Sequence, residues 1–274
     1  MGTGLTGLDE EKIRAREQWG QDPCGAEYDR EHELGTREFF DNVESHRYSE
    51  YAPWMPRLMG FEKFRDARLL EIGCGMGTDL LQFARGGARC TGIDLTPRSV
   101  EITRHRFRLY GAAGDFMISD GERLPFCDES FDVVYSNGVL HHTPGTAEAI
   151  REVHRVLRPG GVAKVMLYHR NSLNYWVEIV MRRGLLAGEF LRGRSAEEIM
   201  SRVIEYSDHG ARPLVKVYSR RQARGLFSCF RNVATEVEQL TRAELRFLSP
   251  LISELMLARL RRRIGWNVIV TAIK

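Results

Sequence analysis

The sequence has few of the features that mark disulfide-stabilised or metal-binding proteins. Its five cysteines, Cys24, Cys74, Cys90, Cys127 and Cys229, are odd in number and widely spaced. They form no CxxC pair and are accompanied by no histidine-rich spacing, so neither a zinc site nor a disulfide framework is expected. We therefore expect a protein without bound metal that resides in a reducing compartment.

Long apolar runs are also missing. The best candidate, residues 177–191, is interrupted by Arg182, Arg183 and Glu189, which makes it too charged to span a membrane. The first residues show no basic region followed by an apolar run, which is the pattern of a secretory signal. We expect a soluble, cytoplasmic protein.

The sequence shows no excess of charge of one sign either. Its 40 Lys and Arg residues against 37 Asp and Glu residues give a formal net charge of +3. This composition does not require nucleic acid as a partner. A chain of 274 residues is long enough for one large α/β domain with additional cover segments.

What the sequence does contain is an alternation of short apolar runs and helical patterns. We predict strands at residues 68–72, 89–93, 115–119, 131–135, 162–168, 233–239 and 266–273. The helices predicted between them are 79–85, 97–110, 146–157 and 219–230. Such alternation is typical of the doubly wound α/β fold, with a largely parallel sheet and right-handed crossovers.

Two segments fall outside this alternation. Residues 1–60 are polar and rich in aromatic side chains, and we predict that they form a helical lid. Residues 171–218 are rich in Trp, Arg and Leu, and we predict a helical cap inserted after the fifth strand, over the carboxyl edge of the sheet. The remaining residues of 61–274 would form the main α/β domain.

The first strand leads into three glycines at alternate positions, Gly73, Gly75 and Gly77. Glycine allows a sharp backbone turn and lets a ligand approach the main-chain amides. A dinucleotide-binding fingerprint would place its third glycine at position 78, where Thr78 stands instead. This spacing disfavours an NAD site.

Acidic residues follow the next two strands. Asp94 comes about 20 residues after the glycine turn, where a carboxylate accepts hydrogen bonds from both hydroxyls of a ribose. Asp120, Gly121 and Glu122 follow the third strand, where a carboxylate and an amide could bind the edge of an adenine. A solvated strand end at Asp94 and an ordinary Asp-Gly turn at Asp120 are the structural alternatives.

Four stretches occur in the order and spacing of a known family: LLEIGCGMGTDL at 69–80, GIDLTPRSV at 92–100, SDGERLPFCDESFDVVYSNGVLHH at 119–142 and EVHRVLRPGGVAKV at 152–165. They resemble the class I S-adenosylmethionine (SAM)-dependent methyltransferases, specifically the UbiE-like group that acts on small molecules. The resemblance implies SAM as the cofactor. It also implies a seven-stranded sheet of order 3-2-1-4-5-7-6 with strand 7 antiparallel.

The resemblance implies roles for single residues. The three glycines would lie against the methionyl part of SAM, Glu71 would help to hold its ammonium group, Asp94 would bind the ribose, and residues 120–122 would surround the adenine. The residues that we assign to cofactor binding are Glu71, Gly73, Cys74, Gly75, Gly77, Asp94, Leu95, Asp120, Gly121, Glu122, Ser136 and Asn137.

Methyl transfer from a sulfonium needs alignment of the acceptor and exclusion of water more than it needs a base. A base becomes useful when the acceptor is a hydroxyl or a protonated amine. His141 and His142 follow the fourth strand and His169 follows the fifth, so these three are the candidate catalytic residues, with His142 preferred. The alternative is that they only shape the loops.

The acceptor is less well defined. We expect methylation of an oxygen or nitrogen atom of a metabolite, lipid or sugar. The apolar and basic residues of 175–194 could form a pocket for a hydrophobic or anionic acceptor, a peripheral contact with acidic lipid, or an amphipathic cover helix with a solvated basic face.

Three other functions stay open: a nucleic-acid methyltransferase, an NAD-dependent oxidoreductase and a non-catalytic SAM-binding protein. Methyltransferases that act on exocyclic amino groups usually carry an Asp/Asn-Pro-Pro-aromatic sequence after the fourth strand, whereas Ser136-Asn137-Gly138-Val139 stands here. Nucleic acid is therefore not the expected partner.

Overall fold

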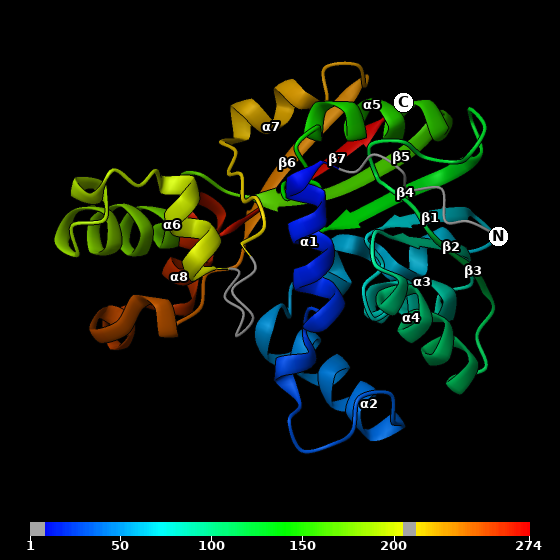
Figure 1. Ribbon diagram of the computed structural model, residues 1–274, viewed down its shortest axis with the longest axis horizontal. Helices are drawn as coiled ribbons and strands as arrows, with labels where there is room; N and C mark the ends of the chain where they lie inside the picture. Colours follow the sequence, from blue (N-terminus) through cyan, green and yellow to red (C-terminus); the bar gives the residue numbers. More distant parts are fainter. Residues whose placement is uncertain (1–8, 205–211) are drawn as a thin grey trace.

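The computed structural model describes residues 9–204 and 212–274 and contains a seven-stranded sheet (Figure 1). The strand order is β3-β2-β1-β4-β5-β7-β6, with β7 antiparallel to both of its neighbours, as predicted. The strands are β1 (Arg68–Ile72), β2 (Arg89–Asp94), β3 (Gly114–Ile118), β4 (Phe131–Asn137), β5 (Leu157–Tyr168), β6 (Asn232–Glu238) and β7 (Asn267–Ile273).

Helices cover both faces of the sheet. The predicted helices are present as α3 (Thr78–Arg85), α4 (Pro97–Leu109), α5 (Thr146–Val156) and α7 (Arg220–Leu226). The helices α5 and α7 lie on one face, and α3 and α4 lie on the other (Figure 1). This is the doubly wound arrangement that the alternation of strands and helices predicted.

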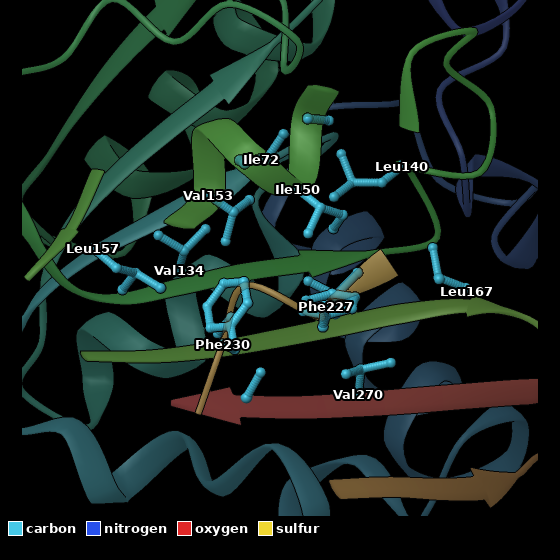
Figure 2. Packing of buried hydrophobic residues seen from close by; sticks show 14 of the residues in the cluster. Ile72, Val134, Leu140, Ile150, Val153, Leu157, Leu167, Phe227, Phe230 and Val270 are labelled. Atoms are coloured by element: carbon cyan, nitrogen blue, oxygen red, sulfur yellow. The ribbon is translucent and has the colours of Figure 1, made fainter. Parts of the chain in front are cut away.

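Side chains alternate between the two faces of the central strands. Leu70 and Val134 enter a core with Ile150 and Val153 of α5 and with Phe227 (Figure 2). The residues that precede Leu70 and Val134 in the chain belong to a second core, together with α3 and residues 52–61. Because both faces are buried, these strands are almost continuously apolar in sequence.

The N-terminal segment is helical, as predicted. It contains α1 (Glu10–Gln21), η1 (Ala26–Tyr28), α2 (Arg37–His46), η2 (Arg47–Tyr51), η3 (Pro56–Gly60) and η4 (Phe61–Phe64). The Asp9 side chain accepts a hydrogen bond from the amide of Lys12 and caps the start of α1. Helix α1 crosses the carboxyl ends of the central strands (Figure 1).

A helical segment follows β5, also as predicted. It contains η5 (Tyr175–Leu186), η6 (Phe190–Arg192) and α6 (Ala196–Val203), and part of the predicted range, residues 205–211, lies outside the described residues. Tyr175, Ile179 and Met200 form a small core of their own with Val215 and Trp266. We call residues 171–204 the cap. Among the residues that the structure describes, no helix is both long enough and apolar enough to cross a bilayer.

One sequence prediction was wrong in detail, and one helix was not predicted. The unpredicted helix is α8 (Glu254–Ile264), which Ser253 caps and η7 (Ala243–Leu251) precedes, and its last turn carries Arg261, Arg262 and Arg263. Strand β5 begins at Leu157 rather than at 162, because Leu157 pairs with Phe131 before the register shifts at an irregularity.

Candidate active site

The glycine turn after β1 is tightly constrained at its ends and open in its middle. All three glycines have left-handed backbones, with φ of 77° at Gly73, 53° at Gly75 and 71° at Gly77. A Cβ at Gly73 would lie 2.2 Å from Val139 Cγ2, and one at Gly77 would lie 2.9 Å from Thr103 Cγ2. A Cβ at Gly75 would meet nothing within 4 Å. The turn therefore presents bare backbone to open space at Gly75.

Asp94 lies beside this turn, at the end of the neighbouring strand. Ile72 of β1 pairs with Ile93 of β2, and the amide of Gly75 donates a hydrogen bond to Asp94 Oδ2 at 3.0 Å. The amide and hydroxyl of Thr96 both donate to Asp94 Oδ1 at 2.9 Å. Burial raises the pKa of Asp94, and these hydrogen bonds partly offset that effect. Leu95 follows in the same bend and is half-buried.

Glu71 is a buried carboxylate that forms no ion pair among the described residues. It is 3% exposed, and its Oε2 has no hydrogen-bond partner among them. Burial raises the pKa of Glu71 well above its usual range, the nearby carboxylate of Asp79 raises it further, and the charge of Arg47 offsets only part of this. A positively charged group placed here would relieve both effects. Cys74, in the adjacent turn, is also buried.

The end of β4 supplies two further polar side chains. Ser136 donates from its hydroxyl to the carbonyl of Ile72 at 3.0 Å, so it ties β4 to the start of the glycine turn. Asn137 is half-buried, and its Oδ1 has no partner among the described residues. The structure therefore brings the predicted residues of β1, β2 and β4 to one edge of the sheet.

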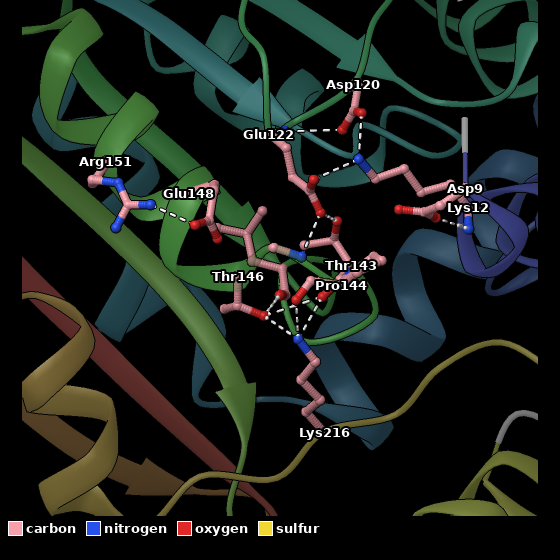
Figure 3. A network of polar contacts seen from close by, with 12 residues as sticks. Asp9, Lys12, Asp120, Glu122, Thr143, Pro144, Thr146, Glu148, Arg151 and Lys216 are labelled. Carbon is pink, nitrogen blue, oxygen red and sulfur yellow. Dashed lines mark hydrogen bonds and ion pairs between the residues drawn. The ribbon is translucent and has the colours of Figure 1, made fainter. Parts of the chain in front are cut away.

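Asp120 and Glu122 are joined to α1 by a buried lysine (Figure 3). Lys12 Nζ lies 2.7 Å from Asp120 Oδ2 and 2.5 Å from Glu122 Oε2, and Lys12 is 8% exposed. Burial alone would lower the pKa of Lys12, but the two carboxylates raise it above its usual value. Gly121 lies between the two acidic residues, where a Cβ would come within 2.9 Å of Ile72 Cγ2.

The loop after β4 is held from two sides (Figure 3). On one side Glu122 accepts hydrogen bonds from the hydroxyl of Thr143 and from the amide of Gly145. On the other side Lys216 Nζ donates to the carbonyls of Thr143 at 2.8 Å and Pro144 at 2.6 Å. The loop that carries the candidate histidines is thus tied both to β3 and to the segment that follows the cap.

His141 and His142 lie in a stack of aromatic rings. The ring centroids of His141 and Tyr168 are 3.9 Å apart, and Tyr168 in turn packs on Trp266 at 4.6 Å. Trp19 of α1 meets His142 edge-on at 4.9 Å. Both rings are buried. Helix α1, the loop after β4 and the end of β5 therefore meet at this stack.

The three candidate histidines differ in their hydrogen bonding. His142 Nδ1 lies 2.8 Å from the carbonyl of Leu214, so in the neutral ring the proton is on Nδ1 and the lone pair is on Nε2. Neither ring nitrogen of His141 has a partner among the described residues, and burial lowers its pKa well below 6.5. His169 Nδ1 lies 3.0 Å from the carbonyl of Gly265, and burial lowers the pKa of this histidine too.

A buried ion pair next to Glu71 anchors the N-terminal segment. Arg47 donates from Nε and a terminal nitrogen to the two oxygens of Asp79, each at 2.7 Å, and Tyr48 and Tyr135 donate to the same carboxylate. Burial would raise the pKa of Asp79, but Arg47 and the hydroxyls lower it. The segment before residue 60 is thus connected to the site by charge as well as by packing.

Sequence reasoning missed Lys12 and the Arg47–Asp79 pair. Lys12 and Asp120 are separated by 108 residues, and no local pattern reveals such a contact. The one available signal is the helical spacing of Lys12, Ala15 and Gln18, whose side chains are all buried on one face of α1.

A surface groove of about 400 Å³ lies away from these residues. It is lined by Glu33, Leu34, Gly35, Thr36, Glu101, Ile102 and His105.

Comparison with known proteins gives a family match over the core of the sheet. Residues 70–165 match the model of a methyltransferase domain. A phthiotriol/phenolphthiotriol dimycocerosates methyltransferase of Mycobacterium ulcerans is 39% identical over 153 residues, which cover 54% of each chain. A 27-O-demethylrifamycin SV methyltransferase of Amycolatopsis mediterranei is 41% identical over 38% of this chain and 40% of its own.

The match to such relatives is partial in length. A sterol 4-C-methyltransferase of Caenorhabditis elegans is 35% identical over 36% of this chain and 30% of its own. The chain thus spans about half or less of the length of these relatives. Among solved structures, an S-adenosylmethionine-dependent methyltransferase from Mesorhizobium loti matches 82% of this chain and 99% of its own with a TM-score of 0.55 and 19% identity. At that identity the match describes the fold.

Proposed function

Because the chain belongs to the class I SAM-dependent methyltransferases, we propose that it transfers a methyl group from SAM to an oxygen or nitrogen atom of a small-molecule acceptor. The observation that carries the proposal is the meeting of three features at one edge of the sheet: an open glycine turn, a strand-end aspartate, and a buried carboxylate with an unpartnered oxygen among the described residues. SAM supplies the reactive methyl group on a sulfonium and also carries an ammonium group and an adenosine.

The residues present fit these parts. Glu71, whose Oε2 has no hydrogen-bond partner among the described residues, suits the ammonium group, and the open space at Gly75 admits the methionyl chain against the backbone. Asp94 suits the ribose. It already accepts three hydrogen bonds, and a carboxylate has about four acceptor positions, so one donor would turn away when two hydroxyls bind. The Thr96 hydroxyl is the donor that can rotate.

Asp120 and Glu122 would border the adenine. Glu122 is committed to Thr143 and Gly145, so its main role would be to position the loop after β4, whereas Asp120 shares Lys12 with it and is the better candidate for contact. Cys74, Leu95 and Gly121 would supply close backbone contacts, and Ser136 and Asn137 would border the methionyl end.

His142 is the best candidate for a base. With its proton on Nδ1, its Nε2 could accept a proton from an acceptor hydroxyl during the transfer, or from an acceptor ammonium before its nitrogen becomes a nucleophile. His141, whose pKa is strongly lowered by burial, would instead line the acceptor site, and His169 would border it from β5. The rings of Trp19, Tyr168 and Trp266 would exclude water from the transfer.

The names of the relatives support an acceptor of substantial apolar area, since they specify a dimycocerosate, a sterol and a rifamycin. The test is mass spectrometry of small molecules retained by the purified protein, before and after incubation with SAM that carries a deuterated methyl group. We expect one retained compound to gain the label, and to do so more slowly with His142→Ala. SAM binding without label transfer to retained or supplied hydroxyl and amine compounds would indicate a non-catalytic SAM-binding protein.

A further inference from the structure

Exposed large hydrophobic side chains gather in two neighbouring parts of the molecule. Among the described residues ten such side chains are exposed, and all but Ile13 belong to the cap or to η7 and α8. Leu186 is 82% exposed and Leu191 is 92% exposed. We call this set the apolar face, and it comprises Trp176, Val177, Met181, Leu185, Leu186, Leu191, Leu251, Leu255 and Met256.

The two parts lie at the same end of the molecule. In Figure 1 the cap and the η7–α8 segment both project beyond the arrowheads of β4 and β5, on the side where α1 crosses the sheet. A concentration of exposed apolar side chains of this kind marks a contact surface rather than ordinary solvent exposure.

Arginines are interspersed with these apolar side chains. On α8 the exposed positions Leu255, Met256, Arg259, Arg262 and Arg263 follow helical spacing, so apolar and basic groups share one face. Residues 175–194 and 251–264 together hold eight arginines and three glutamates, a surplus of five positive charges, which exceeds the +3 of the whole chain. The rest of the chain is therefore slightly acidic.

This mixture suits the surface of an anionic bilayer. Basic groups beside exposed Leu, Met and Trp match the boundary between anionic headgroups and acyl chains, and the surplus of positive charge opposes the docking of a second copy of the same face. Each basic side chain near an anionic leaflet adds to the attraction. The three glutamates do not cancel it, because Glu178 and Glu189 each contact two arginines.

The apolar face is connected to the candidate active site. On its inner side η5 places Tyr175 and Ile179 in the small core that contains Trp266. The ring of Trp266 packs on Tyr168, which packs on His141. A continuous set of apolar and aromatic contacts thus connects the exposed helix to the loop after β4.

We propose that the cap and α8 dock on the surface of a bilayer that contains anionic phospholipid. The docking itself does not depend on methyl transfer. The bilayer contact is peripheral, with the aliphatic side chains inserted among the acyl chains and the arginines at the headgroups.

The test is flotation of the full chain with vesicles of phosphatidylcholine, with and without phosphatidylglycerol. We expect binding to the anionic vesicles that weakens with salt, and weak binding to the neutral ones. Leu186→Glu combined with Leu191→Glu should lower the partition by at least about tenfold. Both side chains are almost fully exposed, so the fold should tolerate these changes.

A matched pair of charge reversals provides the control. Arg262→Glu on the apolar face should lower anionic vesicle binding by about tenfold, whereas Arg89→Glu, at the exposed start of β2, should leave it within about twofold. Equal effects of the two reversals, or no binding of the unmodified chain, would overturn the proposal. The proposal would also be overturned if light scattering showed that the unmodified chain self-associates and that the Leu186→Glu/Leu191→Glu variant does not, because the apolar face would then join copies of this chain. Calorimetry with SAM on the same samples distinguishes the two proposals. SAM binding without vesicle binding would contradict the docking alone, and vesicle binding without SAM binding would contradict the proposed function alone.

Discussion

Replacing Lys12 with methionine should release α1 from the sheet edge. Lys12 contacts two carboxylates, and the side chains of Lys12, Asp120 and Glu122 are only 10%, 18% and 16% exposed, so water screens the contacts little. Hydrogen bonds between charged groups are worth about 1.5–3 kcal/mol, and the variant also leaves two carboxylates side by side. We expect α1 docking to weaken by about 2–3 kcal/mol, which is about a 30- to 150-fold change in its local opening equilibrium.

Hydrogen–deuterium exchange measures this opening directly. The amides of α1 should exchange faster by that factor in Lys12→Met, while the amides of β1 and β4 stay protected. Arg14→Met is the matched control, because Arg14 lies on the same helix, is 51% exposed and, within residues 9–204 and 212–274, forms an ion pair only with the exposed Glu10. Equal α1 exchange in the two variants would refute the argument that Lys12 holds the helix.

The pH dependence of the same contact follows from the carboxylates. Burial alone would raise the pKa of Glu122, but hydrogen bonds from Lys12, Thr143 and Gly145 lower it below 4.5. The stability that Glu122 contributes is therefore present above about pH 4.5 and is lost as the pH falls through the lowered pKa. The protection factors of the α1 amides in the unmodified chain, which divide out the pH dependence of intrinsic exchange, should fall in that acidic range.

Two further predictions concern stability. Gly73→Ala places a Cβ 2.2 Å from Val139 and should lower the free energy of unfolding by about 2–4 kcal/mol. In Gly75→Ala the new Cβ meets open space, so this variant should lose only about 1 kcal/mol, from left-handed backbone strain. Equal urea midpoints of the two variants would contradict this. Burial lowers the pKa of His141 well below 6.5, so the unfolded chain takes up its proton first and stability falls as the pH drops below about 6.5. His141→Phe should reduce this acid loss in urea titrations, with His169 retaining part of it, and an unchanged pH profile would count against burial of a neutral ring.

The sheet could be predicted from the sequence because its signals are local. Each central strand is a short apolar run, and the turn at Gly73–Gly77 marks where the first strand ends. Family motifs then gave the strand order. Helix α8 was missed because four arginines on an eleven-residue helix hide its narrow apolar side, where Leu257 is the buried residue.

The site was predictable only in part. Its strand-end residues follow from the rule that ligands collect at the carboxyl edge of such sheets, and the structure brings Gly75, Asp94 and Glu71 together there. The contributions of Lys12, Trp19 and Arg47 depend on how the N-terminal segment packs, and this packing joins residues far apart in the chain. Lysine side chains are normally solvated, so no local sequence pattern indicated that Lys12 is buried.

Calorimetric titration of the unmodified chain and of Asp94→Ala with SAM tests the central claim most directly. We predict that the unmodified chain binds SAM and that the variant binds it about 5- to 150-fold more weakly, which corresponds to about 1–3 kcal/mol for the loss of a polar partner. A thermal melt of both proteins shows whether the loss of the hydrogen bonds that Asp94 accepts from Gly75 and Thr96 destabilises the fold. Equal SAM affinity in the two folded proteins, or no SAM binding by the unmodified chain, would contradict the account.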